Sequence, residues 1–234
     1  MRVFPRFKFL SRAVVHQENE GEHDLVLERN KYPIVTEGNL CTTLTVWKKS
    51  LLMNCKGFTV IDSDGNLVYR VDNYSLHPHE VILMDASGNS LLTMRRHRKL
   101  GLVDSWNVYK GEKIGKHCTR RTCKLSRSRK SSPVCCVRKS VNILNGNPNV
   151  QAYVYRVTSD SCKRHAAFTV EGSYANRTCK VLDEYKNTLA EIKRKEADTK
   201  YVSFGIDIFQ LIVYPGFDPG FAMALVLLLD QMFS

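Results

Sequence analysis

The stretch DPGFAMALVLLLDQMFS, residues 218–234, holds nine consecutive apolar residues, Phe221–Leu229. Asp218 is a favourable helix N-cap, and Pro219 suits the first helical position, where its missing N–H has no helical partner in any case. We therefore expect a helix from about residue 219 to residue 233. At 1.5 Å per residue this helix is roughly 22 Å long.

The length and the polar residues of this helix indicate that it is buried in protein. The hydrocarbon core of a bilayer is roughly 30 Å thick, and a spanning helix would place Asp230 and Gln231 inside it. The chain as a whole is polar on balance, with a mean hydropathy of -0.28. A helix that is apolar on every side and does not span a membrane needs a protein core around it.

The chain before the helix repeats one hairpin pattern three times. In GFTVIDSDGNLVYRVDNY (57–74), two segments of alternating apolar and polar residues flank an Asp-Ser-Asp-Gly-Asn turn. Segments 81–94 and 179–195 place Asp and Asn at the same positions of a turn. Turn chemistry explains the pattern, because Asp hydrogen-bonds to the backbone two residues on and Gly or Asn tolerates positive φ. Lys186 replaces the glycine in the third copy, so that turn need not be of the same type.

A further strand pattern precedes the helix. The segment YVSFGIDIFQLIVY (201–214) predicts a strand with Phe204, Ile206 and Ile208 on one face. Most of the chain thus forms hairpins, and one apolar helix needs burial. The economical arrangement is a closed antiparallel β-barrel around that helix, because closure also removes exposed sheet edges. The predicted fold class is therefore mainly β.

The length of 234 residues suits one large domain or two small ones. We expect residues 1–40, which are weakly periodic, to form an extension partly packed on or paired with the barrel. Residues 41–234 then form the barrel domain, with Trp47 and Trp106 packed in it. The first fifteen residues, MRVFPRFKFLSRAVV, lack the 7–15-residue apolar run of a secretory signal, so none is expected.

The net charge of +12 and the pI of about 9.4 favour anionic partners. Lipid headgroups, nucleic acid and acidic proteins all qualify, and the charge could equally serve solubility. Residues 110–130 hold nine lysines and arginines against Glu112, a net charge of +8. This segment has few large apolar side chains, which predicts a basic flexible insert.

No pattern in the sequence predicts catalysis, a cofactor or a metal site. The eight cysteines include no CxxC pair, which is typical of reduced thiols in the cytosol or nucleus. His117, Cys118 and Cys123 lack the spacing of zinc ligands. Residues 111–117 depart from a phosphate-binding loop, and residues 62–65 depart from a calcium loop. No nucleophile is paired with a base in any recognisable motif.

Several ordered blocks resemble the LURP-one-related proteins of plants. The blocks are LTVWKKSLLMNCKGFTVIDSDGNLVYRVDNY (44–74), VILMDASGNSLLTMRRHRKL (81–100), VEGSYANRTCKVLDE (170–184), AEIKRKEA (190–197) and YPGFDPGFAMALVLLLDQM (214–232). The resemblance implies a tubby-like fold, shared with phospholipid scramblases, of roughly twelve strands around a C-terminal helix. It further implies phosphoinositide binding among tubby relatives, defence roles in some family members and no established enzymatic activity. It assigns no lipid-binding residue, and residues 110–130 lie outside it.

Two basic clusters at strand ends are candidate lipid contacts. RRHRK follows one predicted strand, and KRK ends another. Such a cluster is either a solvated rim or an anion-binding patch, in which each Lys or Arg near an anionic membrane contributes about 1 kcal/mol. The candidate contacts are Arg95, Arg96, Arg98, Lys99, Lys193, Arg194 and Lys195.

These observations leave three hypotheses for function. The first is a non-enzymatic module of plant stress or defence that either binds anionic phospholipid or phosphoinositide at a membrane surface or is a membrane-tethered regulator. The alternative is a nucleic-acid-associated or protein-scaffold regulator that uses residues 110–130. A scramblase-like activity is the third, and the short helix containing Asp230 argues against it. We expect a cytoplasmic chain, peripheral at the plasma membrane or nuclear, with no transmembrane span and with a protein partner as a further possibility.

Overall fold

A computed structural model describes most of the chain. The described residues are 41–53, 55–72, 79–97, 104–111, 132–140, 149–157, 166–196 and 204–233. The predicted N-terminal extension, residues 1–40, lies outside them, as does almost all of the predicted basic insert at 110–130. Those two expectations therefore stay predictions.

The described residues contain twelve strands and one helix. The strands are β1 (Thr42–Trp47), β2 (Phe58–Ile61), β3 (Leu67–Val71), β4 (Glu80–Asp85), β5 (Ser90–His97), β6 (Ser105–Lys110), β7 (Cys135–Lys139), β8 (Val150–Arg156), β9 (Ala166–Ser173), β10 (Thr178–Leu182), β11 (Thr188–Arg194) and β12 (Ile208–Val213). The helix, α1, spans Pro219–Phe233, where the sequence predicts it.

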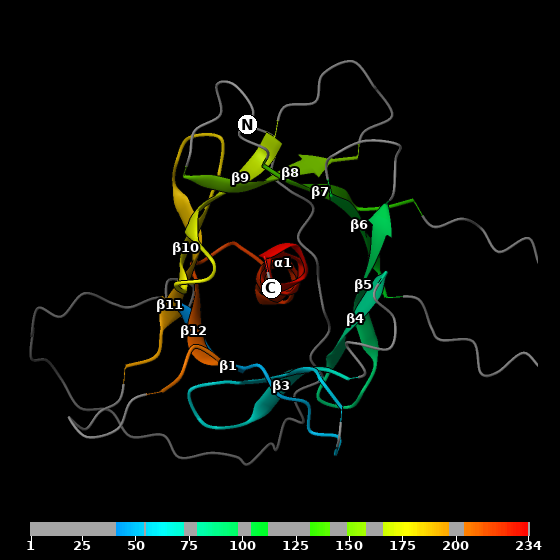
Figure 1. Cartoon of the computed structure of the whole chain (residues 1–234), viewed down its shortest axis with the longest axis vertical. Coiled ribbons are helices and arrows are strands. Elements are labelled where there is room, and N and C mark those ends of the chain that lie inside the picture. Colours follow the sequence, from blue (N-terminus) through cyan, green and yellow to red (C-terminus); the bar gives the residue numbers. More distant parts are fainter. Residues whose placement is uncertain are drawn as a thin grey trace, which may run out of the picture. The chain divides into compact units, whose positions relative to one another are not determined.

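The strands form one closed antiparallel barrel around α1 (Figure 1). Each strand pairs with its neighbours in the chain, and β1 closes the ring by pairing with β12 over the register Thr42↔Val213 to Trp47↔Ile208. This closure leaves no free edge strand among them, which removes the template for unwanted strand pairing. The predicted fold class, a closed barrel around a C-terminal helix, is confirmed.

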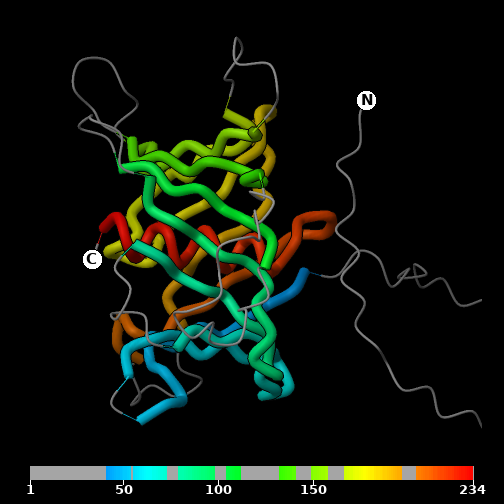
Figure 2. Tube along the Cα trace, turned by 90° about the vertical axis from the view of Figure 1, so that its right-hand side faces the viewer, coloured from blue at the N-terminus to red at the C-terminus, as the bar shows by residue number. Residues whose placement is uncertain are grey.

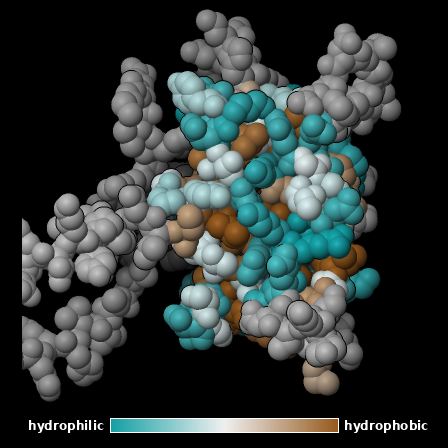
Figure 3. Space-filling model, turned by 90° about the vertical axis from the view of Figure 1, so that its left-hand side faces the viewer, coloured by the Kyte–Doolittle hydropathy of each residue, from teal (hydrophilic) through white to brown (hydrophobic). Residues whose placement is uncertain are grey.

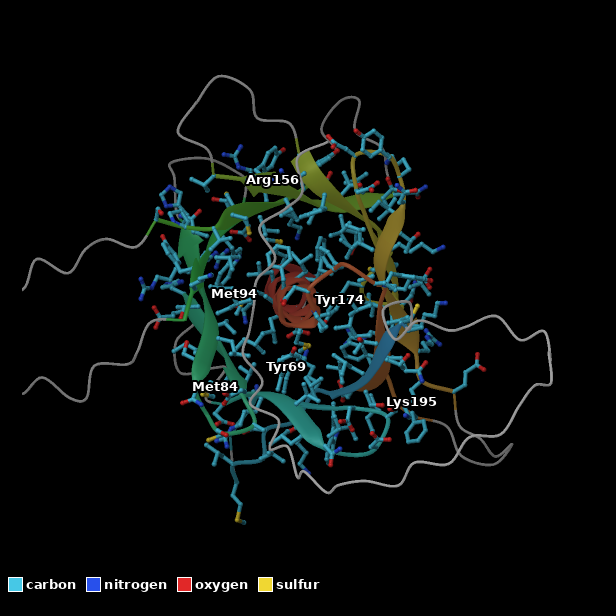
Figure 4. The ribbon with its side chains drawn as sticks, turned by 180° about the vertical axis from the view of Figure 1, so that it is seen from behind. Tyr69, Met84, Met94, Arg156, Tyr174 and Lys195 are labelled. Carbon is cyan, nitrogen blue, oxygen red and sulfur yellow. The ribbon has the colours of Figure 1, made fainter. Side chains whose placement is uncertain are left out.

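The helix is the centre of the hydrophobic core. Nine consecutive residues of the helix, Ala222–Asp230, are buried, and the last of them is an aspartate. In Figure 4, Met94, Tyr69 and Tyr174 lie inside the barrel around the helix, whereas Met84, Arg156 and Lys195 lie on its wall. The barrel supplies inward side chains from all sides, so an all-round apolar helix is stable here without a membrane.

The three predicted hairpins are confirmed and share one turn geometry. Asp62, Asp85 and Asp183 each accept hydrogen bonds from the backbone N–H and side-chain amide of the Asn four residues on, at 2.8–3.2 Å. The residue three positions after the aspartate has positive φ in each turn, namely 84° at Gly65, 85° at Gly88 and 66° at Lys186. The lysine therefore adopts the glycine conformation, and the third turn is of the same kind as the other two.

Two expectations about individual side chains are wrong. The strand predicted at 201–214 begins only at Ile208, and its buried face is Phe209, Leu211 and Val213. Ile206 is 57% exposed because residues 205–208 form a turn, closed by the Ile208 N–H donating to the Gly205 carbonyl.

The second error concerns the tryptophans. Trp106 is buried in the core as expected, whereas Trp47 is 41% exposed. On β1 the inward positions are Leu44 and Val46, so the alternation of the strand turns Trp47 to the outside.

The antiparallel order defines two ends of the barrel. Odd-numbered strands all run toward one end and even-numbered strands toward the other. We call the first the basic end, where β1, β5 and β11 finish and α1 finishes. We call the second the turn end, where the turns at 62–66, 86–89 and 183–187 lie and α1 begins. Figure 2 shows α1 lying lengthwise inside the barrel between them.

Candidate functional site

Basic side chains of the barrel concentrate at the basic end. Among the described residues there are 16 lysines and arginines against 14 aspartates and glutamates. Thirteen of the 16 lie within three residues of a strand end, or in a connection, at the basic end. They are Lys48, Lys49, Lys56, Arg70, Arg95, Arg96, Arg138, Lys139, Arg177, Lys180, Lys193, Arg194 and Lys195.

The turn end has the opposite balance. Its described cations are Lys110, Arg156 and Lys186. Its acids are twice as many, namely Asp62, Asp64, Asp85, Asp183, Glu184 and Asp218. The described barrel is thus nearly neutral in sum but polarised along its axis, with the positive pole where α1 ends.

The predicted cluster at 95–99 lies at the basic end, and its described members are ion-paired. Arg95 Nε lies 2.6 Å from Glu80 Oε2, and its guanidinium lies 5.3 Å from the centre of the Tyr109 ring. Arg96 pairs with Asp104. Arg98 and Lys99 lie outside the described residues. An anion that binds Arg95 or Arg96 must therefore compete with a carboxylate that already holds it.

The predicted cluster at 193–195 is less fully compensated. Lys193 Nζ lies 2.5 Å from Glu191 Oε2, and that hydrogen bond raises the pKa of Lys193. Arg194 donates instead to a neutral group, the Asn176 carbonyl, at 3.1 Å. Lys195 donates to Thr45 Oγ1 at 3.0 Å and lies over the Phe204 ring. The outer face over these strands is mainly hydrophilic with hydrophobic side chains between (Figure 3).

The structure brings the two predicted clusters to one end but not to one patch. β5 and β11 are six places apart in the ring of twelve, so they occupy opposite walls. Arg95 and Arg194 therefore cannot hold one small headgroup between them. A broad surface such as a bilayer could contact both clusters, since both lie at the basic end.

Further cations at the same end were missed by the sequence analysis. Lys48 Nζ lies 2.8 Å from Asp230 Oδ1, and Lys139 Nζ donates to the Met232 carbonyl at 2.7 Å. These lysines come from opposite walls, on either side of the last turn of α1. They satisfy the carbonyl and carboxylate groups at a helix end that carries partial negative charge. Their position in the sequence could have indicated them, because each lysine lies at or just after the end of a strand.

A buried polar cluster surrounds the same helix end. Tyr174 OH donates to Asp230 Oδ1 at 3.0 Å, and burial, reinforced by that carboxylate, raises the pKa of Tyr174 far above its ordinary range. Arg177 lies over the rings of Tyr174 and Phe209, at 4.1 and 4.4 Å, and donates to the Ile206 carbonyl at 2.9 Å. Through Asp230, this cluster holds the last turn of α1 against the barrel wall.

The described residues contain no group of three or more His, Cys, Asp or Glu side chains that could hold a metal ion. Burial raises the pKa of the Cys179 thiol to about 12 and also raises the pKa of Cys135. Such thiols are poor nucleophiles at neutral pH. Cys118, Cys123 and His117 lie outside the described residues.

Comparison with known proteins identifies the family. The sequence profile described as LURP-one-related matches residues 42–230, which is most of the chain. The chain belongs to the LURP-one-related family. Protein LURP-one-related 17 of Arabidopsis thaliana is 46% identical over 99% of this chain and 100% of its own length. Protein LURP-one-related 8 of the same plant is 44% identical over 87% of this chain and 95% of its own.

A solved structure supports the fold of this LURP-one-related chain. An X-ray structure of a protein from Arabidopsis thaliana matches 83% of this chain and 92% of its own, with 22% identity and a TM-score of 0.54. The names of the LURP-one-related relatives state no enzymatic activity. Within the part of the chain that the structure describes, no helix is long and apolar enough to cross a bilayer.

Proposed function

We propose that this LURP-one-related chain is a non-enzymatic module that binds an anionic lipid surface, such as one containing phosphoinositide, through the basic end of its barrel. The observation that supports it is the charge polarity of the barrel, with thirteen of the 16 described cations at that end. Each Lys or Arg near an anionic membrane contributes about 1 kcal/mol, so several acting together recruit a protein weakly but measurably. The chain would then be peripheral at a cytoplasmic membrane face.

The cations at the basic end should not contribute equally. Arg194 and Lys195 donate to neutral oxygens, so a phosphate need not displace a carboxylate from them. Arg95 and Arg96 are held by Glu80 and Asp104, so their net attraction for an anion is smaller. We therefore expect the 193–195 cluster to carry at least as much binding as the 95–99 cluster.

Sedimentation with vesicles tests the proposal. Phosphatidylcholine vesicles are compared with vesicles that also hold phosphatidylserine or a phosphoinositide at equal total charge, at two salt concentrations. Replacing Lys193, Arg194 and Lys195 by Ala should weaken binding at least tenfold, which is about 1.4 kcal/mol. Replacing Arg95, Arg96, Arg98 and Lys99 should also weaken it. The melting temperature should stay unchanged, because partly exposed ion pairs contribute little to stability.

The barrel supplies a matched control for these variants. Lys110, Arg156 and Lys186 are the three described cations at the turn end. Replacing them by Ala removes the same charge and should leave vesicle binding nearly unchanged. Equal losses from the two triple variants would contradict a basic-end surface and indicate attraction by net charge alone. A wild-type chain that ignores all anionic vesicles at low salt would refute the proposal.

The second candidate is a regulator that binds nucleic acid or a protein through residues 110–130. It is favoured by the distribution of charge, since the whole chain has 35 lysines and arginines against 23 acids while the described residues are nearly balanced. This segment leaves the barrel at the end of β6, Lys110, and the chain re-enters it at the start of β7, Cys135; both positions lie at the turn end, opposite the basic end. Deleting 112–130 should therefore abolish nucleic-acid binding if this candidate is correct and leave headgroup-selective vesicle binding in place if it is not.

The other functional expectations rest on the family alone. A role in plant stress or defence follows from the resemblance to LURP-one-related proteins and belongs to this proposal. A scramblase-like activity is disfavoured, because it requires α1 to leave the barrel. Asp230 would then lose Lys48 and Tyr174 as partners and enter hydrocarbon, where a carboxylate is costly.

A further inference from the structure

Exposed large apolar side chains gather at the basic end. Seven such side chains are exposed among the described residues, and five lie at this end. Three are consecutive in the connection between β1 and β2, where Leu51 is 52%, Leu52 42% and Met53 90% exposed. The others are Trp47, 41% exposed, and Ile206, 57% exposed. Figure 2 shows this connection, in blue to cyan, at one corner of the barrel.

Hydrogen bonds fix the base of this connection, so the direction of its tip is defined. Ser50 is buried, and its Oγ donates to Asp72 Oδ1 at 3.2 Å and accepts the Leu52 N–H at 3.0 Å. Thr59 Oγ1 donates to the Lys49 carbonyl at 2.7 Å. These bonds involve Ser50 and the residues on either side of the tip. Ser50 thus faces inward, and the apolar residues Leu51, Leu52 and Met53 face outward.

Lysines flank the apolar tip on both sides. Lys48 and Lys49 precede it, and Lys56 follows it. Lys49 Nζ lies 5.0 Å from the centre of the Trp47 ring. The backbone N–H of Lys48 donates to the Asp207 carbonyl at 2.8 Å, which joins the loop to the turn that exposes Ile206. Apolar tip, cationic flanks and a tryptophan beside them are the features that suit the interface of an anionic bilayer.

We propose that the connection between β1 and β2, described at residues 48–53 and 55–57, is a membrane-insertion loop. Leu51, Leu52 and Met53 enter the boundary between headgroups and acyl chains, while Lys49 and Lys56 contact lipid phosphates. Trp47 lies at the headgroup level. The loop sets the orientation of the barrel, with the basic end toward the bilayer. This inference rests on the proposed function and adds to charge attraction an apolar contribution that salt does not screen.

The two native tryptophans allow a direct test. Trp106 is buried and stays in the core, so a change in tryptophan emission on vesicle binding reports Trp47. We expect phosphatidylcholine–phosphatidylserine vesicles to shift this emission to shorter wavelength, and brominated acyl chains in the same vesicles to quench it. Phosphatidylcholine alone should do neither. Trp47→Phe should abolish the response and leave only the Trp106 signal.

Variants of the tip complete the experiment. Replacing Leu51, Leu52 and Met53 together by Ser should abolish the quenching and weaken vesicle binding at least tenfold at high salt, with unchanged far-ultraviolet circular dichroism and melting temperature. Val157 and Tyr185 are exposed apolar residues at the turn end. Replacing them should change neither the quenching nor the vesicle binding.

The outcomes separate the two proposals. If wild-type chain sediments with anionic vesicles but Trp47 is not quenched, or if the Ser variant binds like wild type, the insertion loop is refuted and lipid binding by charge stands. If the wild-type chain does not sediment with anionic vesicles at low salt, both proposals fail. A chain that self-associates through the tip without vesicles would also overturn the insertion loop.

Discussion

Asp62, Asp85 and Asp183 each fix a hairpin through the same hydrogen bonds. In each turn one carboxylate accepts the N–H groups of its own loop, at distances near 2.8 Å. Bonds to the charged form lower the pKa of Asp62 and of Asp183, chiefly through Asn66 and Asn187. The contacts span only four residues, which is why they can be predicted from the sequence.

Lys186 is strained by the place it occupies in the third turn. Its φ is 66°, and the left-handed conformation costs a residue other than glycine about 1–2 kcal/mol. Glycine's greater freedom in the unfolded chain offsets about 0.5–1 kcal/mol of that. Lys186→Gly should therefore have a free energy of unfolding about 0.5–1 kcal/mol higher than Lys186→Ala, which lacks the same ion pair, as measured by urea unfolding.

Lys186→Ala is the matched control, because it also removes the Lys186–Glu171 ion pair but keeps a β-carbon in the turn. It should be no more stable than wild type, since an exposed pair contributes about 0–1 kcal/mol. If the Ala and Gly variants were equally stable, the turn would not be strained at this position.

At the scale of single elements, α1 is defined by its first turn. The Phe221 N–H donates to Asp218 Oδ1 at 2.6 Å, and the Ala222 N–H donates to the Asp218 carbonyl at 2.9 Å. Burial raises the pKa of Asp218, although the N–H groups of the first turn act in the opposite direction. Burial, with the Asp218 carboxylate nearby, likewise raises the pKa of Tyr69 to about 12.

Replacing the cap separates its hydrogen bond from its charge. Asp218→Ala should lower the free energy of unfolding by about 1 kcal/mol, because the first turn loses its acceptor. Asp218→Asn keeps an acceptor and removes the cost of burying a charge, so at pH 7 it should be at least as stable as wild type.

The pH dependence follows from the raised pKa of Asp218. The folded state binds the proton more tightly than the unfolded state, so ionisation of Asp218 destabilises the fold above the folded pKa. The advantage of Asp218→Asn over wild type should be greatest at pH 7 and disappear as the pH falls below the ordinary value of 3.8. Urea unfolding of both proteins at several pH values measures this difference in stability. An advantage that grows on acidification would contradict the sign.

At the scale of the whole molecule, the barrel and α1 each need the other. The inward side chains of the twelve strands and the buried side chains of α1 form one hydrophobic core, and Leu227 near the middle of the helix is fully buried. Leu227→Ala should lower the free energy of unfolding by about 2–5 kcal/mol. Leu227→Asp buries an unpaired charge and should abolish cooperative unfolding, since a domain is stable by only about 5–15 kcal/mol.

Gln231→Asp provides the control, because Gln231 is half-buried at the basic end of the same helix. It should cost much less than Leu227→Asp in thermal unfolding followed by circular dichroism. If the Leu227→Asp chain unfolded cooperatively and lost only vesicle binding, α1 would be a membrane anchor and not the core of the barrel.

Local chemistry explains what the sequence by itself determined. The helix at 219–233, its cap at Asp218, the three hairpins and the need for a closed barrel all depend on contacts within a few residues or on the apolar character of one segment. The family resemblance was likewise visible in ordered blocks and is confirmed. The basic clusters at 95–99 and 193–195 could be identified from the sequence. The carboxylates that pair with them, and the distance between the two clusters in space, could not be predicted.

Only the tertiary structure decided how distant segments meet. Closure of the ring places β5 and β11 on opposite walls, so two clusters that look alike in sequence do not form one site. Trp47 faces outward because Leu44 and Val46 face the core from the same strand, and Ile206 is exposed because it lies in a turn before β12. Alternation says which residues share a face, whereas the choice of the inner face belongs to partners far away in the chain. For the same reason, the polarity of the barrel and the apolar tip at Leu51–Met53 emerge only once all twelve strands are in place.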